Sequence, residues 1–196
     1  MVKENVLSVV EIDRLEQAAL ALLRGAMGEE GPYSVAIGAV IAALLNRWHH
    51  GLRDSETTIR LVFHLWSDVE GLPRRLFLPE APVPTAETIL DEAGGVDALP
   101  PESQFAVALL AHIVSYGIGG DADAWERAAP EIAAKASARE PSSQLLRNWP
   151  YYLGRTKETE GLWKYLMAEV HARFDGRGAY GEYMRHMLTY RQPGTV

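Results

Sequence analysis

Apolar residues recur at the spacing of an α-helix along almost the whole chain, and no stretch shows the strict alternation typical of a half-buried β-strand. The 196 residues are enough to bury a substantial core. Hydrophobic residues make up 47% and charged residues 23%, as in ordinary packed proteins. These features predict an all-α protein, with residues 1–196 forming a single domain of about nine helices.

Capping residues, glycines and prolines predict where the helices begin and end. Ser8 and Glu11 have the spacing of a capping box, which starts the first helix near Val9 and lets it run to Met27. A helix that opens at Asp121 is expected to be interrupted or kinked at Pro130. The other expected helices cover residues 33–50, 54–70, 85–93, 101–116, 143–148, 156–174 and 179–190.

Two of these segments have a predicted place in the fold. The helix 33–50 is apolar nearly all round, which is typical of a helix at the centre of a domain. Three prolines between residues 74 and 84 exclude a regular helix, so an irregular connection and a candidate hinge are expected over residues 73–84.

Three glycine-centred turns, at Gly51, Gly117 and Gly154, each join an apolar helix to a second helix in the same rotational phase. A glycine at such a turn lets the chain reverse, which predicts antiparallel helical hairpins. A solenoid-like stack of these hairpins resembles the architecture of tetratricopeptide and HEAT-type repeats, although no unit carries the tetratricopeptide pattern. Glycine-closed hairpins also occur in all-α proteins without repeats, and that interpretation stays open.

Charge is distributed unevenly along the chain. The net charge is −7, but residues 1–144 carry a balance of −10 and residues 145–196 a balance of +3. The same last 52 residues hold nine of the 17 aromatic side chains. This polarisation is the most unusual feature of the sequence.

The basic, aromatic C-terminal segment predicts a surface for another macromolecule, because arginine, tyrosine and tryptophan are enriched in binding hot spots. Eight cations interleave there with the aromatics: Arg147, Arg155, Lys157, Lys164, Arg173, Arg177, Arg185 and Arg191. The predicted contact residues flank a proline-broken helix end and are Arg147, Trp149, Tyr151, Tyr152 and Arg155. The alternative is that the aromatics close the core while the cations reach solvent.

The expected partner is a protein. Residues 80–140 carry a balance of −8, which would repel a nucleic acid unless that segment faced away from it. The same acidic segment allows another reading, in which the chain is an inhibitor or immunity-type protein that covers a basic target. A transcription regulator of the TetR kind is excluded, because residues 1–46 hold three cations against six acids and lack its recognition helix.

A metal-dependent or small-molecule enzyme is the rival class. His64 with Asp68, and Glu182 with His186, are each four residues apart, so each pair shares a helix face and could offer two metal ligands. The spacing motifs of di-iron bundles and zinc peptidases are missing, and His112 is expected to be a core histidine. No serine elbow or phosphate loop is present. The sequence therefore predicts no cofactor and favours a non-enzymatic adaptor.

Cysteine is absent, which excludes disulfides and thiolate chemistry and fits a reducing cytoplasm. Acidic residues interrupt the N-terminal segment, so no export signal is expected. The uncharged run over residues 31–46 has 16 residues, fewer than the roughly 20 needed to span a bilayer, and no membrane association is expected.

Overall fold

The computed structural model describes residues 6–25, 30–67, 83–148 and 163–189. Within these ranges the chain forms nine α-helices and two short 3₁₀ turns, and no strand. The predicted all-α class is therefore confirmed. The elements are α1 (Val9–Gly25), α2 (Glu30–His49), α3 (Ser55–Ser67), α4 (Ala86–Glu92), η3 (Val96–Ala98), α5 (Pro101–Ile113), η4 (Ser115–Gly117), α6 (Ala122–Arg139), α7 (Gln144–Arg147), α9 (Trp163–Phe174) and α10 (Gly178–Thr189).

Side-chain caps set the predicted starts of several helices. Ser8 and Glu11 form the reciprocal capping box before α1, with the Ser8 backbone N–H donating to Glu11 Oε2 at 2.7 Å and the Glu11 N–H donating to Ser8 Oγ at 3.3 Å. Thr85, Asp121 and Ser143 accept from the third backbone N–H after them, which starts α4, α6 and α7. The expected ends near Met27 and Gly71, the start at Thr156 and most of the connection 73–84 lie outside the described residues.

The expected interruption of α6 at Pro130 is wrong, because one continuous helix runs from Ala122 through Pro130 to Arg139. The alternative, a kink at Pro130, stays a prediction. Pro130 is exposed, so its ring displaces no packed side chain. The next residues, Ile132 and Ala133, are buried in the core. We attribute the continuity to the packing of α6 along α5, which offsets the lost helical hydrogen bond.

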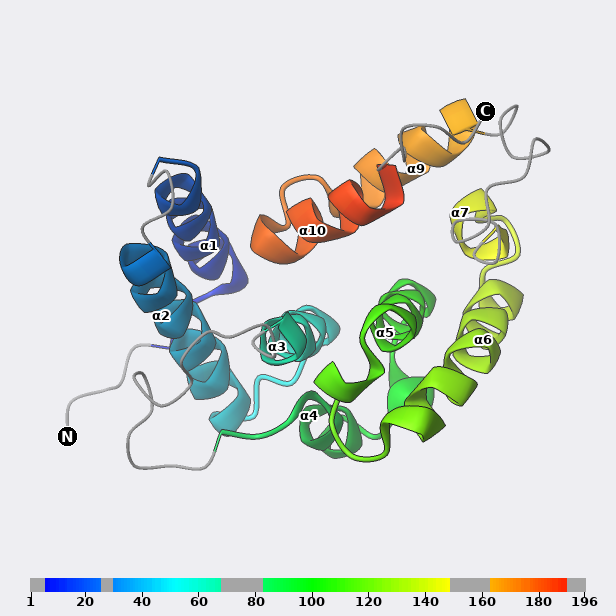
Figure 1. The fold of residues 1–196 in the computed structure, drawn as a ribbon, viewed down its shortest axis with the longest axis horizontal. Helices are drawn as coiled ribbons and strands as arrows, with labels where there is room; N and C mark the ends of the chain where they lie inside the picture. Colours follow the sequence, from blue (N-terminus) through cyan, green and yellow to red (C-terminus); the bar gives the residue numbers. More distant parts are fainter. Residues whose placement is uncertain (1–5, 26–29, 68–82, 149–162, 190–196) are drawn as a thin grey trace.

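The central helix is α3, and not α2 as its apolar sequence predicts. All ten residues from Thr57 to Trp66 are buried in α3. By contrast, α2 lies at one side of the molecule (Figure 1), and its Val35 is 61% exposed. The sequence disguises the central position of α3 because this helix buries two ionisable residues, Arg60 and His64, among its apolar ones.

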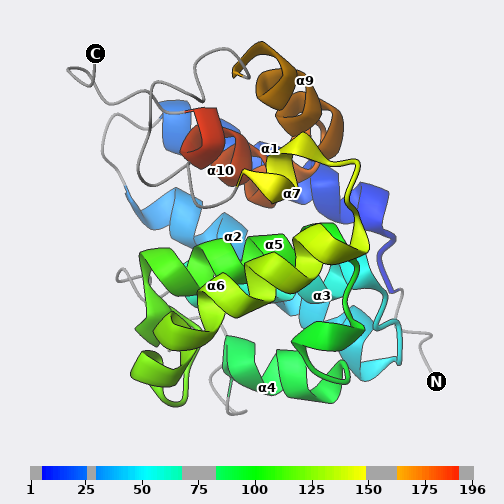
Figure 2. The same cartoon turned by 90° about the vertical axis from the view of Figure 1, so that its right-hand side faces the viewer.

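Helix pairs pack side by side, but they do not form a simple linear array. In Figure 1, α1 lies along α2 and α5 along α6, while α9 and α10 form a third pair. The C-terminal helix α10 packs against α1 and α3, so helices from the two ends of the described chain meet. A solenoid repeat contacts only its neighbours, and this closure departs from that pattern. Figure 2 shows the same closure from the side, with α10 beside α1 and above α5.

The predicted glycine turns are described at two of the three places. Gly51 has a φ of +78° between α2 and α3, a backbone conformation that favours glycine. Gly117 ends η4 between α5 and α6. The third turn, at Gly154, lies outside the described residues, so the three-unit repeat stays a prediction.

Candidate functional site

The structure describes one of the five predicted partner contacts. Arg147 is the last residue of α7, its side chain is exposed, and it forms no ion pair with another residue of the described ranges. The other four predicted contacts lie outside those ranges: Trp149, Tyr151, Tyr152 and Arg155.

Several cations of the expected C-terminal surface point into the molecule instead. The side chains of Arg173 and Arg177 are only 17% and 19% exposed and pair with glutamates of other elements. Arg185 pairs with Asp175, with 3.3 Å between its Nε and Oδ1 of the aspartate. Sequence patterning places these cations near the aromatics but does not show whether their partners lie inside or outside the chain.

The alternative metal site does not assemble within the described residues. His64 is 2% exposed and its Nε2 lies 2.7 Å from Glu16 Oε1, while Glu182 pairs with Arg24. His186 is exposed on α10, and Asp68 falls outside the described ranges. In those ranges no group of three or more histidine, aspartate or glutamate side chains is arranged to hold a metal ion.

The expectation for His112 is wrong. This side chain is exposed near the C-terminal end of α5, because the inward positions of that turn are taken by Leu109 and Leu110.

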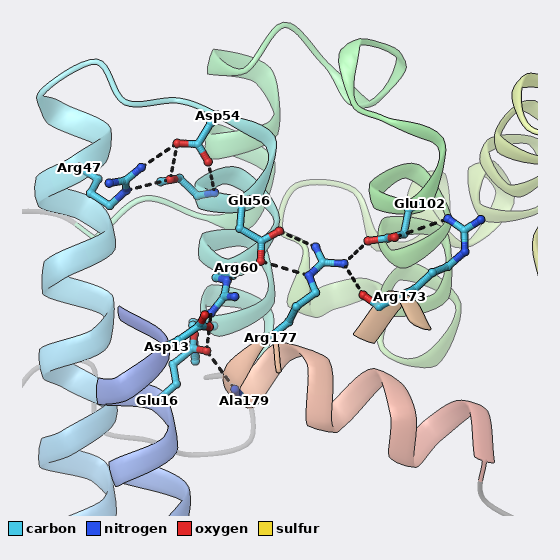
Figure 3. A network of polar contacts seen from close by, with 12 residues as sticks. Asp13, Glu16, Arg47, Asp54, Glu56, Arg60, Glu102, Arg173, Arg177 and Ala179 are labelled. Atoms are coloured by element: carbon cyan, nitrogen blue, oxygen red, sulfur yellow. Dashed lines mark hydrogen bonds and ion pairs between the residues drawn. The ribbon is translucent and has the colours of Figure 1, made fainter. Parts of the chain in front are cut away.

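The most distinctive polar feature is a buried network that the sequence did not reveal. We call it the ionic junction and define it as Asp13, Glu16, Glu56, Arg60, His64, Glu102, Arg173 and Arg177. In Figure 3, the α1 carboxylates meet Arg60 of α3, and Glu16 also reaches the start of α10. Glu56 of α3 and Glu102 of α5 meet arginines from the α9–α10 region. The junction thus joins elements far apart in the sequence.

Glu16 of α1 lies at the inner end of the junction and is fully buried. Its Oε2 accepts from Arg60 Nη1 at 2.7 Å and from the backbone N–H of Ala179 at 3.0 Å, while Oε1 faces His64. Ala179 belongs to the first turn of α10, where backbone N–H groups have no helical partner. Glu16 therefore acts as an N-terminal cap supplied to α10 by another helix.

The cap also explains why glycine occupies position 178, directly before Ala179. A Cβ on Gly178 would lie 1.5 Å from Glu16 Oε2, and Gly178 has a φ of +57°. Both the close approach of the carboxylate and the backbone conformation require glycine.

Arg60 of α3 is held by three carboxylates. Its Nη1 lies 2.5 Å from Asp13 Oδ1 and 2.7 Å from Glu16 Oε2, and its Nε donates to Glu56 Oε1 at 2.7 Å. Burial alone would lower the pKa of Arg60, but the carboxylates outweigh it and the pKa is raised. The guanidinium thus stays charged in the interior because its Nε and Nη1 both face acids.

Arg177, in the turn between α9 and α10, forms the outer half of the junction. It donates to both carboxylate oxygens of Glu56, at 3.1 Å from Nε and 2.6 Å from Nη2, and it also pairs with Glu102 of α5. Its guanidinium lies 4.9 Å from the ring centre of Tyr180. Arg173 of α9 extends the network, because it forms ion pairs with Glu102, Glu140 and Glu169.

The junction is suited to holding helices together rather than to chemistry on a substrate. Glu16 and His64 resemble an acid–base pair, yet a substrate could not touch Glu16 in this arrangement because the side chain is 0% exposed. Its arginines are likewise engaged by carboxylates of the same chain. One sequence signal could have indicated it: Arg60 lies within the apolar stripe of Ile59, Val62 and Phe63.

A different surface remains open beside α7. Tyr165, on the first turn of α9, is 67% exposed. One turn later on the same helix, Glu169 accepts from the Leu145 backbone N–H at 3.0 Å and from the Ser143 hydroxyl. Because residues four apart share a helix face, Tyr165 lies on the side of α9 that meets α7. We call the exposed side chains of Arg147 and Tyr165, one from each of these two contacting helices, the α7–α9 surface.

Within the described residues no helix is both long and apolar enough to cross a membrane. Comparison with protein-family models, with curated proteins and with solved structures finds no match for this chain.

Proposed function

We propose that this chain is a non-enzymatic helical binding protein that recognises a protein partner through its C-terminal basic and aromatic surface. The supporting observation is the contrast among the arginines of that region. Arg147 is exposed and forms no ion pair within the described residues, whereas Arg173 and Arg177 are engaged by carboxylates of the same chain. Arg147 and Tyr165 therefore form the described part of the binding surface.

The position of this surface is fixed by α7 and α9. Glu169 caps α7 from the neighbouring helix, and Arg173 in turn holds Glu169 through an Nε–Oε1 contact of 3.0 Å. Leu145 and Leu146 of α7 are buried in the core. A surface held this way loses little conformational entropy on binding, which favours recognition.

Residue chemistry favours an acidic protein partner over a nucleic acid. Arginine and tyrosine are the side chains most enriched at protein interfaces, and a lone exposed guanidinium suits a carboxylate on the partner. Nucleic-acid binding instead rests on many phosphate contacts, and the large acidic excess of residues 1–144 opposes it.

Affinity capture with the purified full-length chain tests the proposal, with the captured partner identified by mass spectrometry and titrated against each variant. Arg147→Glu and Tyr165→Ala should each weaken binding about tenfold or more, as expected for hot-spot residues, without altering the helical circular dichroism. Arg127→Glu makes the same charge change at another exposed position, on α6, and should leave binding unchanged. Equal binding by all three variants would contradict the proposal.

A further inference from the structure

The contact between the last two helices and the rest of the molecule is strongly polarised in charge. We define the C-terminal hairpin as residues 163–189 and the body as the described residues up to 148. The hairpin supplies Arg173 and Arg177, and the body supplies the carboxylates that receive them, Glu56, Glu102 and Glu140. One ion pair runs the other way, between Arg24 of α1 and Glu182 of α10.

A further contact also joins negative charge on the body to positive charge on the hairpin. The N-terminus of α10, which carries partial positive charge, receives the buried carboxylate of Glu16 from α1. The acidic body and the basic C-terminal segment of the sequence thus meet within one molecule. Neutralising carboxylates on the body would remove the ion pairs of Arg173 and Arg177 with the body at once.

The carboxylates at this contact are shielded from water. The side chains of Glu56, Glu102 and Glu140 are 26%, 20% and 33% exposed. Burial alone would raise the pKa of Glu56, but Arg177 and Arg60 outweigh it and the pKa of Glu56 is lowered. A charge held in this way resists screening by salt better than a fully exposed one does.

The hairpin packs against aromatic side chains of α3. Phe63 and Trp66 of α3 pack against Tyr183 of α10, with ring centres 5.2 and 5.5 Å apart, and Phe63 also meets Tyr180. The Tyr180 hydroxyl is fully buried and has no hydrogen-bond partner among the residues that the structure describes. A buried unpaired hydroxyl costs free energy, and that cost disappears when the hairpin separates from the body.

From these contacts we propose that the C-terminal hairpin is an acid-released clasp: when the body carboxylates that receive it are protonated, it separates from a body that is still folded and exposes the aromatic face of α3.

The direction follows from the groups that face these carboxylates. They are Asp13 of α1, Tyr33 of α2, Arg60 and His64 of α3, Arg173 of α9, Arg177, and Tyr180 of α10. The arginines stay charged throughout. Because the pKa of Glu56 is lowered on folding, its contribution is fully present above its ordinary value of 4.5 and is lost as the pH falls below it. Protonation leaves Arg177 and Arg60 buried without acids, and separation returns Arg177 to water.

Hydrogen exchange of the full-length chain, followed by mass spectrometry from pH 7 to pH 3 and corrected for intrinsic rates, tests the clasp. Peptides from α10, a short helix that is marginal without its packing, should lose protection at a higher pH than peptides from α3, α5 and α6. Loss of protection at one common pH would overturn the proposal, as would an α10 that stays protected until α5 and α6 unfold.

Glu56→Gln imitates protonation at a single site and should raise exchange in α10 about tenfold at pH 7, while α5 and α6 are unchanged; tenfold corresponds to about 1.4 kcal/mol. Glu131→Gln is the matched control, because this glutamate on α6 is 73% exposed and pairs with Lys135 of its own helix. Unchanged exchange in α10 of a folded Glu56→Gln chain would overturn the role of Glu56. If that variant does not fold, the pH series of the unmodified chain still decides.

Discussion

At the scale of single residues, the account rests on charges that are buried together. Glu16, Arg60 and His64 are each at most 2% exposed, and each has a partner of complementary chemistry within 2.7 Å. Removing one partner from such a group leaves a buried charge without a counter-charge. This destabilises the folded protein more than replacing the whole pair with apolar residues would. These buried charges also restrict which residue types can lie next to them, and Gly178 is the clearest example.

Gly178→Ala should destabilise the protein by clearly more than Gly176→Ala. Both glycines have positive φ, +57° and +76°, so each substitution carries a similar backbone cost of about 1 kcal/mol. A Cβ at position 176 meets nothing within 4 Å, whereas one at position 178 collides with the carboxylate of Glu16. The difference between the two urea midpoints isolates that collision. Equal midpoints would show that Glu16 does not approach α10 as described.

At the scale of elements, local signals and packing decide different things. The capping residues Ser8, Thr85, Asp121 and Ser143 act within one turn, so they can be read from the sequence and mark real helix starts. Proline at position 130 also acts locally, but the packing of α6 on α5 overrides it. Local rules therefore predict where helices begin better than whether a helix continues through an unfavourable residue.

Pro130→Ala should stabilise the protein, by about 1 kcal/mol or more, because alanine restores a backbone donor and relieves the ring's clash with the preceding turn. The position is exposed, so no packing is lost. Pro101→Ala is the control: Pro101 occupies the first turn of α5, where the missing N–H is not needed, and its replacement should change stability little. Thermal unfolding of the two variants compares these effects. A destabilised Pro130→Ala chain would contradict this account of α6.

At the scale of the whole molecule, ion pairs between the acidic body and the basic C-terminal hairpin hold the two parts together. The all-α class and most helix positions could be predicted, because periodicity and capping are local properties. The junction could not, since Glu16 and Arg60 are 44 residues apart and only the tertiary fold brings them together. For the same reason His64 was paired in the sequence with Asp68 on its own helix, although its observed partner is Glu16 of another.

Counting charges along the sequence does not show whether an arginine pairs with a carboxylate of the same chain or with one of a binding partner. The sequence therefore predicts that the cations of the C-terminal segment reach solvent, whereas Arg173 and Arg177 meet carboxylates of the body. Arg147 is the one member of the predicted contact set that the structure describes, and its side chain is exposed at the end of α7.

A double-mutant cycle between Glu56 and Arg177, measured by urea unfolding at pH 7, tests the central claim most directly. The two side chains meet through two hydrogen bonds and are mostly shielded from water, so their coupling free energy should be about 1–3 kcal/mol. The same cycle between Asp97 and Lys135, an exposed pair 3.2 Å apart, should give roughly 0–1 kcal/mol. A Glu56–Arg177 coupling no larger than that of the exposed pair would contradict the claim that internal charge pairing holds the C-terminal hairpin on the body.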